Sequence, residues 1–246
     1  MNSYTKTVID TSLPTSSMRK SALIVGVLYL ITFISIPTLA LYHSVHEPNF
    51  ILSLGSNTSV IVGGILEIIV ALAGIGTAVT LYPILKNQNE GLALGLVSCR
   101  VLEAGTIFAG VMFILTIVNL QQNGAGTQAL ISSRTLVIMY DRMFLIGQSL
   151  MPAINDILLG FLLYQSRLVP RFLSLLGLIG GPLLIAGDIC VLFGLIGQHD
   201  PSTSLFAVPV AIFEFSIGVY LILKGFNSKN NEEEETTDEI IQFGRD

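Results

Sequence analysis

Six long runs of hydrophobic residues divide the chain. They cover approximately residues 20–42, 59–85, 92–119, 142–165, 171–196 and 205–224. Crossing the hydrocarbon core of a bilayer, which is about 30 Å thick, takes about 20 helical residues at 1.5 Å each, and each run reaches that length. The pattern therefore predicts an all-α integral membrane bundle of about six transmembrane helices, with the lipid bilayer as its surroundings.

Composition supports this class. The chain is 52% hydrophobic and 12% charged, with a mean hydropathy of +0.74, whereas soluble domains carry about 25% charged residues. The first apolar run is longer than the core of a secretory signal, which is about 7–15 residues. We therefore expect this run to be retained as a membrane helix.

The charged residues divide the chain into three parts. Residues 229–246 carry seven acids and two bases, a net charge of −5, while residues 1–228 carry ten of each. We predict a polar N-terminal segment at 1–18, a six-helix transmembrane domain at 19–226 and an acidic, disordered tail at 227–246. Because the membrane domain has no basic stripe, we expect no nucleic-acid partner.

Basic residues near the helix ends predict the orientation of the bundle. Two of them, Arg134 and Arg142, fall on one predicted side. Eight fall on the other: Lys6, Arg19, Lys20, Lys86, Arg167, Arg171, Lys224 and Lys229. Lys and Arg favour the cytoplasmic side of a membrane. We predict a multi-pass protein of the cell membrane with both termini in the cytoplasm.

The connections between the runs differ in length. Residues 86–91 and 165–170 are short, so the helices that they join should be antiparallel neighbours. The longest connection, residues 120–141, begins polar and glycine-rich and then becomes mixed apolar. This change predicts a short helix lying on the outer leaflet of the membrane.

Six ionisable residues fall inside the predicted spans. They are Glu67, Arg100, Glu103, Asp156, Asp188 and Glu214. An Asp or Arg at the centre of a membrane helix costs about 2.5–3.5 kcal/mol on the insertion scale, so none of the six should face lipid. Each acid also shares its helix face with small or polar residues, as Gly63, Ala71 and Gly74 do around Glu67. Small residues let helices approach closely, so we expect all six on packed faces.

One arginine cannot neutralise five carboxylates. Arg100 precedes Glu103 by three residues and therefore lies beside it on one helix surface. We expect Arg100 to pair with Glu103 or with an acid on a neighbouring helix, and other acids to be protonated or neutralised by a cation or a wet cavity. Residue counting predicts two depths below the outer helix ends: about 12–14 Å for Glu67, Asp188 and Glu214, and about 20 Å or more for Glu103, Asp156 and Arg100.

Asp156 is the strongest single candidate for a working residue. Gln148, Pro152 and Asn155 lie on the same helix face. A proline inside a helix removes one backbone hydrogen bond, here freeing the carbonyl of Gln148. This combination predicts a polar spot near the middle of the membrane.

Motifs for catalysis and for metal binding are weak. No Walker motif and no Gly-x-Ser-x-Gly elbow occurs in the sequence. The predicted outer loops hold His43 and His46 near Glu47, and His199 beside Asp200. These side chains could bind a transition metal, but loop histidines usually meet solvent. We expect no catalytic residue, no cofactor and no metal site.

Three short segments resemble a known family. They are Arg19 with Gly26-Val-Leu-Tyr-Leu-Ile-Thr-Phe33, then Leu162-Leu-Tyr-Gln-Ser-Arg167, then Leu168-Val-Pro-Arg-Phe-Leu-Ser-Leu-Leu-Gly177. Together they resemble the bacterial domain of unknown function family 4386 over residues 18–226. The resemblance implies a polytopic bacterial membrane protein and brings no established activity or catalytic residues.

Three functions are compatible with the buried charges. The leading hypothesis is a small permease or a proton- or cation-responsive membrane protein, with a proton, a cation or a small solute as its partner. The first alternative is a non-catalytic bundle that binds a partner protein or lipid. The second is an intramembrane enzyme.

Overall fold

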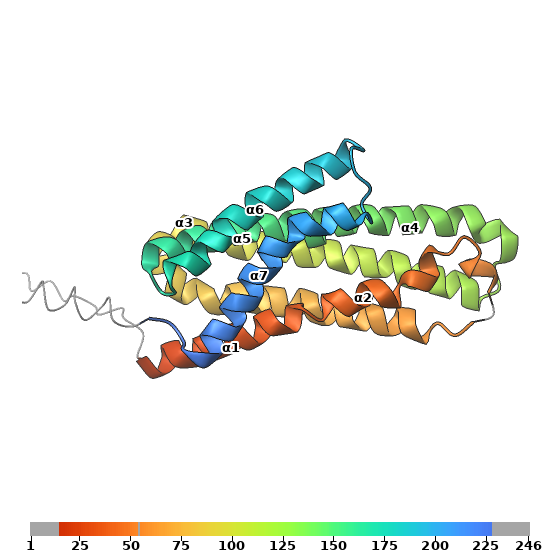
Figure 1. The fold of residues 1–246 in the computed structure, drawn as a ribbon. Coiled ribbons are helices and arrows are strands. Elements are labelled where there is room, and N and C mark those ends of the chain that lie inside the picture. The colour runs from red at the N-terminus through yellow and green to blue at the C-terminus, as the bar shows by residue number, and fades with distance from the viewer. Residues whose placement is uncertain (1–14, 54, 228–246) are drawn as a thin grey trace, which may run out of the picture.

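Every regular element in the described part of the chain is a helix (Figure 1). The computed structural model describes residues 15–53 and 55–227. Four helical stretches are long and apolar enough to cross a membrane: Thr58–Gln122, Gly126–Ser166, Arg171–Leu192 and Pro201–Leu223. They support the predicted all-α membrane bundle, though not by themselves a count of six. Most of the predicted N-terminal segment and acidic tail lies outside the described residues, and α1 begins at Thr15.

The first apolar run forms two helices rather than the one that we expected. α1 is Thr15–Thr32 and α2 is Ser35–Leu41. The Thr32 hydroxyl donates to the carbonyl oxygen of Tyr29, and the backbone amides of residues 33 and 34 bond three residues back instead of four. This local hydrogen bonding competes with the regular helical ladder and breaks it. Two short 3-10 helices follow, η1 at His43–His46 and η2 at Phe50–Leu52.

A single element, α3 at Thr58–Gln122, contains two of the predicted runs. Its one non-helical residue is Asn89, with φ −158° and ψ 104°. Asn89 Oδ1 accepts a hydrogen bond from the amide of Leu92, as an N-cap residue does. The arms on either side fold back on each other, since Gly64 lies beside Val111 and Gly74 beside Arg100. The loop expected at 86–91 is therefore reduced to a kink.

The next long helix corrects the prediction of an interfacial helix at 120–141. After the 3-10 helix η3 (Gly126–Ala129), α4 (Leu130–Phe144) continues without a break into η4 (Leu145–Leu150) and α5 (Met151–Ser166). The element η4 is a π-helix. Pro152 follows it, and proline has no amide hydrogen and clashes with the carbonyl four residues earlier. A widened turn accommodates this defect, so the chain remains helical.

The last two helices pack closely on the others through glycines. They are α6 (Arg171–Leu192) and α7 (Pro201–Leu223). A Cβ atom at Gly177 would lie 2.9 Å from the carbonyl oxygen of Asp156, and one at Gly181 would lie 2.6 Å from that of Ala153. These contacts confirm that the small-residue face of the fifth predicted run is a packing face.

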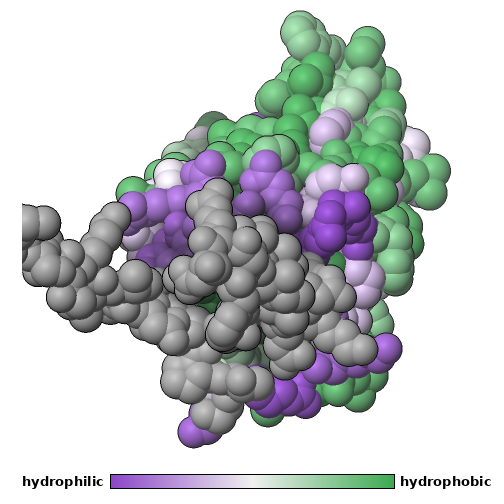
Figure 2. All heavy atoms as spheres, turned by 90° about the vertical axis from the view of Figure 1, so that its left-hand side faces the viewer, coloured by the Kyte–Doolittle hydropathy of each residue, from purple (hydrophilic) through white to green (hydrophobic). Residues whose placement is uncertain are grey.

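Both ends of the described chain lie at one end of the bundle (Figure 1). Arg19, near the start of α1, donates to the carbonyl oxygens of Leu221 and Ile222 at the end of α7, at 3.0 and 2.7 Å. Figure 2 shows hydrophilic groups gathered at this end and hydrophobic groups along the sides. Many large apolar side chains are exposed on the long helices, as Leu72, Met112 and Phe172 are, which fits contact with lipid.

Buried apolar residues form four core clusters in the described part of the chain, two large and two small. One large core packs α1, α3, α5, α6 and α7 around residues such as Leu81 and Phe213. The other packs η1, α3 and α4 around residues such as Ile114. On α3, Glu67, Arg100 and Glu103 fall between the parts that enter the two large cores. The candidate site therefore lies at the middle of the bundle.

Candidate functional site

A buried ion cluster joins α3 to α7. Arg100 Nη1 donates to both carboxylate oxygens of Glu103, at 3.1 and 2.9 Å, and Nη2 donates to Oε1 of Glu214 at 2.8 Å. The guanidinium also lies over the ring of Tyr29, 5.6 Å from its centroid. Asn155 of α5 donates to Glu103 Oε2 at 2.6 Å. Arg100 thus pairs both with Glu103 on its own helix and with an acid on a neighbouring helix, Glu214, which were the two alternatives expected from the sequence.

Asp156 lies next to this cluster but has no hydrogen-bond partner for either carboxyl oxygen among the described residues. Its side chain is fully buried, and the charges of Glu214, Arg100 and Glu103 are close enough to act on it. Burying an unpaired carboxylate is costly, so this group accommodates a proton or a cation more easily than a lasting negative charge.

Glu67 lies on the arm of α3 before the Asn89 kink, in a polar pocket separate from the Arg100 cluster. It accepts hydrogen bonds from the hydroxyls of Tyr42 and Tyr140, at 3.2 and 2.8 Å, and from the amide of Gln148 at 3.0 Å. The two tyrosine rings meet edge to face. Three donors from α2–η1, α4 and η4 therefore converge on one buried carboxylate, which ties these segments together.

Asp188 of α6 has one partner. Ser149 of η4 donates to Oδ1 at 2.6 Å, and Oδ2 has no partner among the described residues. The π-helix thus presents Gln148 to Glu67 and Ser149 to Asp188, so that adjacent residues reach acids on different helices.

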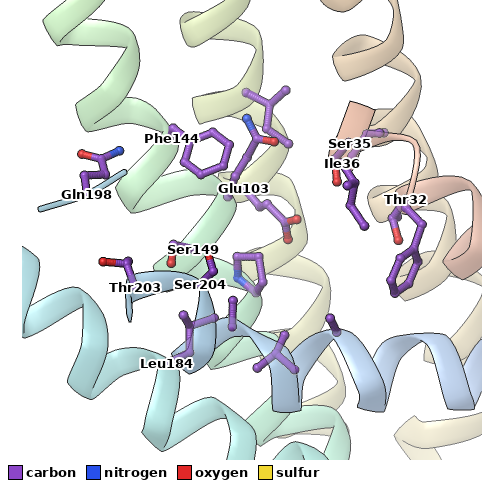
Figure 3. A pocket seen from close by; sticks show the side chains of 18 of the residues that line it. Thr32, Ser35, Ile36, Glu103, Phe144, Ser149, Leu184, Gln198, Thr203 and Ser204 are labelled. Atoms are coloured by element: carbon purple, nitrogen blue, oxygen red, sulfur yellow. The ribbon is translucent and has the colours of Figure 1, made fainter. Parts of the chain in front are cut away.

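A cavity of about 710 Å³ lies beside these groups (Figure 3). At its inner end, three of the predicted site residues line it: Arg100, Glu103 and Glu214. The other three predicted residues, Glu67, Asp156 and Asp188, are not on the lining, although the donors to Glu67 and Asp188 are. In Figure 3, Thr32, Ser35 and Ile36 at the break between α1 and α2 lie across the cavity from Ser149 and Gln198.

Glu214 pairs directly with Arg100, although residue counting placed Glu214 nearer the outer helix ends. We placed the start of the last run at residue 205, but α7 begins at Pro201. Thirteen residues at 1.5 Å put Glu214 about 20 Å from the start of its helix. The six predicted residues form one cluster of three with Asp156 next to it, and two separate acids.

The open end of the cavity carries two of the loop histidines together with a carboxylate that the sequence did not suggest as their partner. His46 Nε2 lies 3.1 Å from Asp141 Oδ1, and His199 Nε2 lies 3.8 Å from the same oxygen. The hydrogen bond to Asp141 raises the pKa of His46, while partial burial opposes this shift. Asp141 falls within the stretch expected to be interfacial, and no local pattern marked it as a partner of the two histidines.

Fold and site together define a helical membrane protein with a cavity that ends on a buried ion cluster. Residues 24–225 match the family described as domain of unknown function (DUF4386), and because this is most of the chain, the protein belongs to that family. The resemblance found in the sequence is thereby confirmed. No curated protein and no solved structure matches the chain.

Proposed function

We propose that the chain crosses the cell membrane six times, with both termini in the cytoplasm. The two arms of α3 supply two crossings, and α1 with α2, α4 with α5, α6, and α7 supply four. The contact of Arg19 with the end of α7 supports termini on one side, and the excess of Lys and Arg supports the cytoplasm. Reporter fusions at residues 1 and 246 should both report a cytoplasmic location. Opposite locations would contradict six crossings.

We propose further that the protein is a small permease for small cationic solutes. The observation that carries this proposal is the cavity of about 710 Å³ that ends on the ion cluster of Arg100, Glu103 and Glu214. Ligand pockets are typically about 300–1,000 Å³. His43 and His199, with side chains 82% and 65% exposed, lie at the other end of the cavity. With cytoplasmic termini, this open end would face outward.

Charge at the inner end favours a cation. When ionised, Glu103 and Glu214 contribute −2 against the +1 of Arg100, which leaves a net −1. An ammonium group or another cation would complement this charge. Phe33, Ile107 and Val210 on the cavity wall are apolar, so they suit the hydrocarbon part of such a solute.

Asp156 supports a response to protons. It lies behind the cluster, fully buried and without a donor in the described part of the chain. Binding a cation at Glu214 would make a negative charge on Asp156 less costly, so solute binding and proton release would favour each other. Such linkage is what a proton-coupled permease requires.

Flux in proteoliposomes tests the proposal. The probes are organic cations of increasing size, from methylammonium to tetraphenylphosphonium, with benzoate as the anionic comparison. We expect saturable cation uptake that falls at least about tenfold in Glu214→Gln, which is about 1.4 kcal/mol. Glu90→Gln is the matched control, because Glu90 is exposed near the kink of α3 and does not line the cavity.

Two results would overturn the permease proposal. One is uptake of none of the cations by the wild-type protein. The other is equal uptake by Glu214→Gln and the wild type. Cation binding without flux would instead favour the alternative of a non-catalytic membrane bundle.

A further inference from the structure

A second polar cluster lies at the open end of the cavity, apart from the ion cluster of Arg100. His46 of η1, Asp141 of α4 and His199 of the connection between α6 and α7 each present a ligand atom there. These three atoms all lie within 4.8 Å of one another. We propose that the three residues form a binding site for a divalent transition-metal ion, with Zn²⁺ as the best-fitting occupant.

The spacing of the ligand atoms fits a tetrahedral ion. Bonds from zinc to nitrogen and oxygen are about 2.0–2.1 Å long, which puts neighbouring ligand atoms about 3.3 Å apart. The Nε2 atoms of His46 and His199 lie 3.1 and 3.8 Å from Asp141 Oδ1. The His199 side chain is 65% exposed, so it has room for the small rotation that would close the site. Two imidazoles and one carboxylate also form a known zinc ligand set that leaves a fourth position open.

The other ring nitrogen of His46 gives independent support. Nδ1 lies 3.0 Å from the carbonyl oxygen of Tyr42, which can only accept, so Nδ1 carries a hydrogen and donates it. In the neutral ring, Nε2 then directs its lone pair at Asp141 Oδ1. Two such electron-rich atoms at 3.1 Å favour a positive species between them, either a proton on Nε2 or a metal ion. A backbone carbonyl that fixes the tautomer in this way is the usual outer partner of a metal-bound histidine.

The protein also holds the two distant ligand segments together without an ion. Gln198, next to His199, donates from Nε2 to the carbonyl oxygen of Asp141 at 2.7 Å. This bond fixes the connection between α6 and α7 against α4. His46, Asp141 and His199 all line the cavity. An ion bound by them would therefore join three segments across the open end of the cavity. The fourth coordination position of the ion would be accessible from the cavity.

Metal binding can be measured without any transport assay, so its failure is distinct from failure of the permease. The full-length protein is purified in detergent with its affinity tag removed, stripped with a chelator and titrated with Zn²⁺ in a calorimeter. Co²⁺ serves as a second probe, read by its visible absorption. We expect one ion per chain and a higher melting temperature with Zn²⁺.

Substitutions at the three ligands define the site. Affinity for Zn²⁺ should fall at least about tenfold in His46→Gln, Asp141→Asn and His199→Ala, while His199→Cys should keep it because a thiolate binds zinc. His43→Ala is the matched control: it lies in the same η1 segment, 82% exposed and near Glu47. Circular dichroism verifies that each variant is folded, and the exposed position of His199 makes its variants the safest.

Three results would overturn the proposal. They are no stoichiometric Zn²⁺ binding by the wild type, equal weakening by His43→Ala, and full binding by the His199→Ala variant. If Zn²⁺ bound to the acidic C-terminal residues instead, His199→Ala would still bind it fully, because every variant retains those residues.

Discussion

Replacing Arg100 with methionine tests whether the inner ion cluster stabilises the bundle. The Arg100 side chain is 2% exposed and lies 2.9 Å from Glu103 and 2.8 Å from Glu214. Removing one partner of a buried pair costs about 3–5 kcal/mol, because the other charge stays buried and uncompensated. Glu214 faces the cavity and can be hydrated there, so we expect a loss of about 3–4 kcal/mol rather than the sum for two broken pairs.

The assay is unfolding in mixed micelles by increasing sodium dodecyl sulfate, followed by circular dichroism. Arg134→Met on the exposed face of α4 is the control and should change the free energy of unfolding by less than about 0.5 kcal/mol. Adding Glu103→Gln and Glu214→Gln to Arg100→Met removes the orphaned charges and should recover most of the loss. A loss in Arg100→Met no larger than in the control, or no recovery in the triple variant, would refute the reasoning.

Three further predictions concern single groups. Gly147→Ala should destabilise the fold by about 1–3 kcal/mol in the same assay, because its new methyl would overlap the Thr106 side chain, whereas Gly105→Ala meets nothing within 4 Å and should be neutral. Asp156→Asn should keep the wild-type melting temperature, because the amide preserves the shape of a carboxyl group that no described residue donates to. The same variant should flatten the pH dependence of cation uptake. A large loss of stability would instead show that the charge of Asp156 is structural. The third measurement is made with chelator present, so that no metal ion competes with the proton. Because the hydrogen bond to Asp141 raises the pKa of His46, protonated His46 stabilises the fold fully at low pH, and this stabilisation is lost as the pH rises through the raised pKa. The melting temperature should therefore fall over that range more steeply for the wild type than for Asp141→Asn, and parallel curves would contradict the pairing.

Much of the fold could be predicted because membrane helices are specified by local apolarity. The connections were less predictable, since composition marks residues 86–91 as polar but does not show that Asn89 alone makes the turn. The stretch at 120–141 contains polar and apolar residues in a mixture that suits a membrane surface. Its continuation into α5 depends on the π-helix, whose wider turn has no signature beyond Pro152.

The candidate site was predicted in its residues but not in its grouping. The cost of burying charge identified the six ionisable positions, and five of them are buried to 7% exposure or less, while Glu214 faces the cavity. Which acid meets Arg100 depends on helix tilt and on where α7 starts, and sequence spacing fixes neither. The tyrosines around Glu67 and the carboxylate of Asp141 come from segments far away in the sequence.

The π-helix sets the angular register of one long helix. Each α-helical residue turns the chain by about 100°, so eight residues would leave Tyr140 and Gln148 about 80° apart around the axis. The wide turn takes up one additional residue and reduces this angle to about 20°, which is why both side chains reach Glu67. Straightening Leu145–Leu150 into a regular α-helix, with no residue removed, would swing the half that carries Asn155 by about 100° relative to the half that carries Tyr140. Loss of the wide turn at constant chain length would thus separate the Glu67 pocket from the Arg100 cluster without removing any of their side chains.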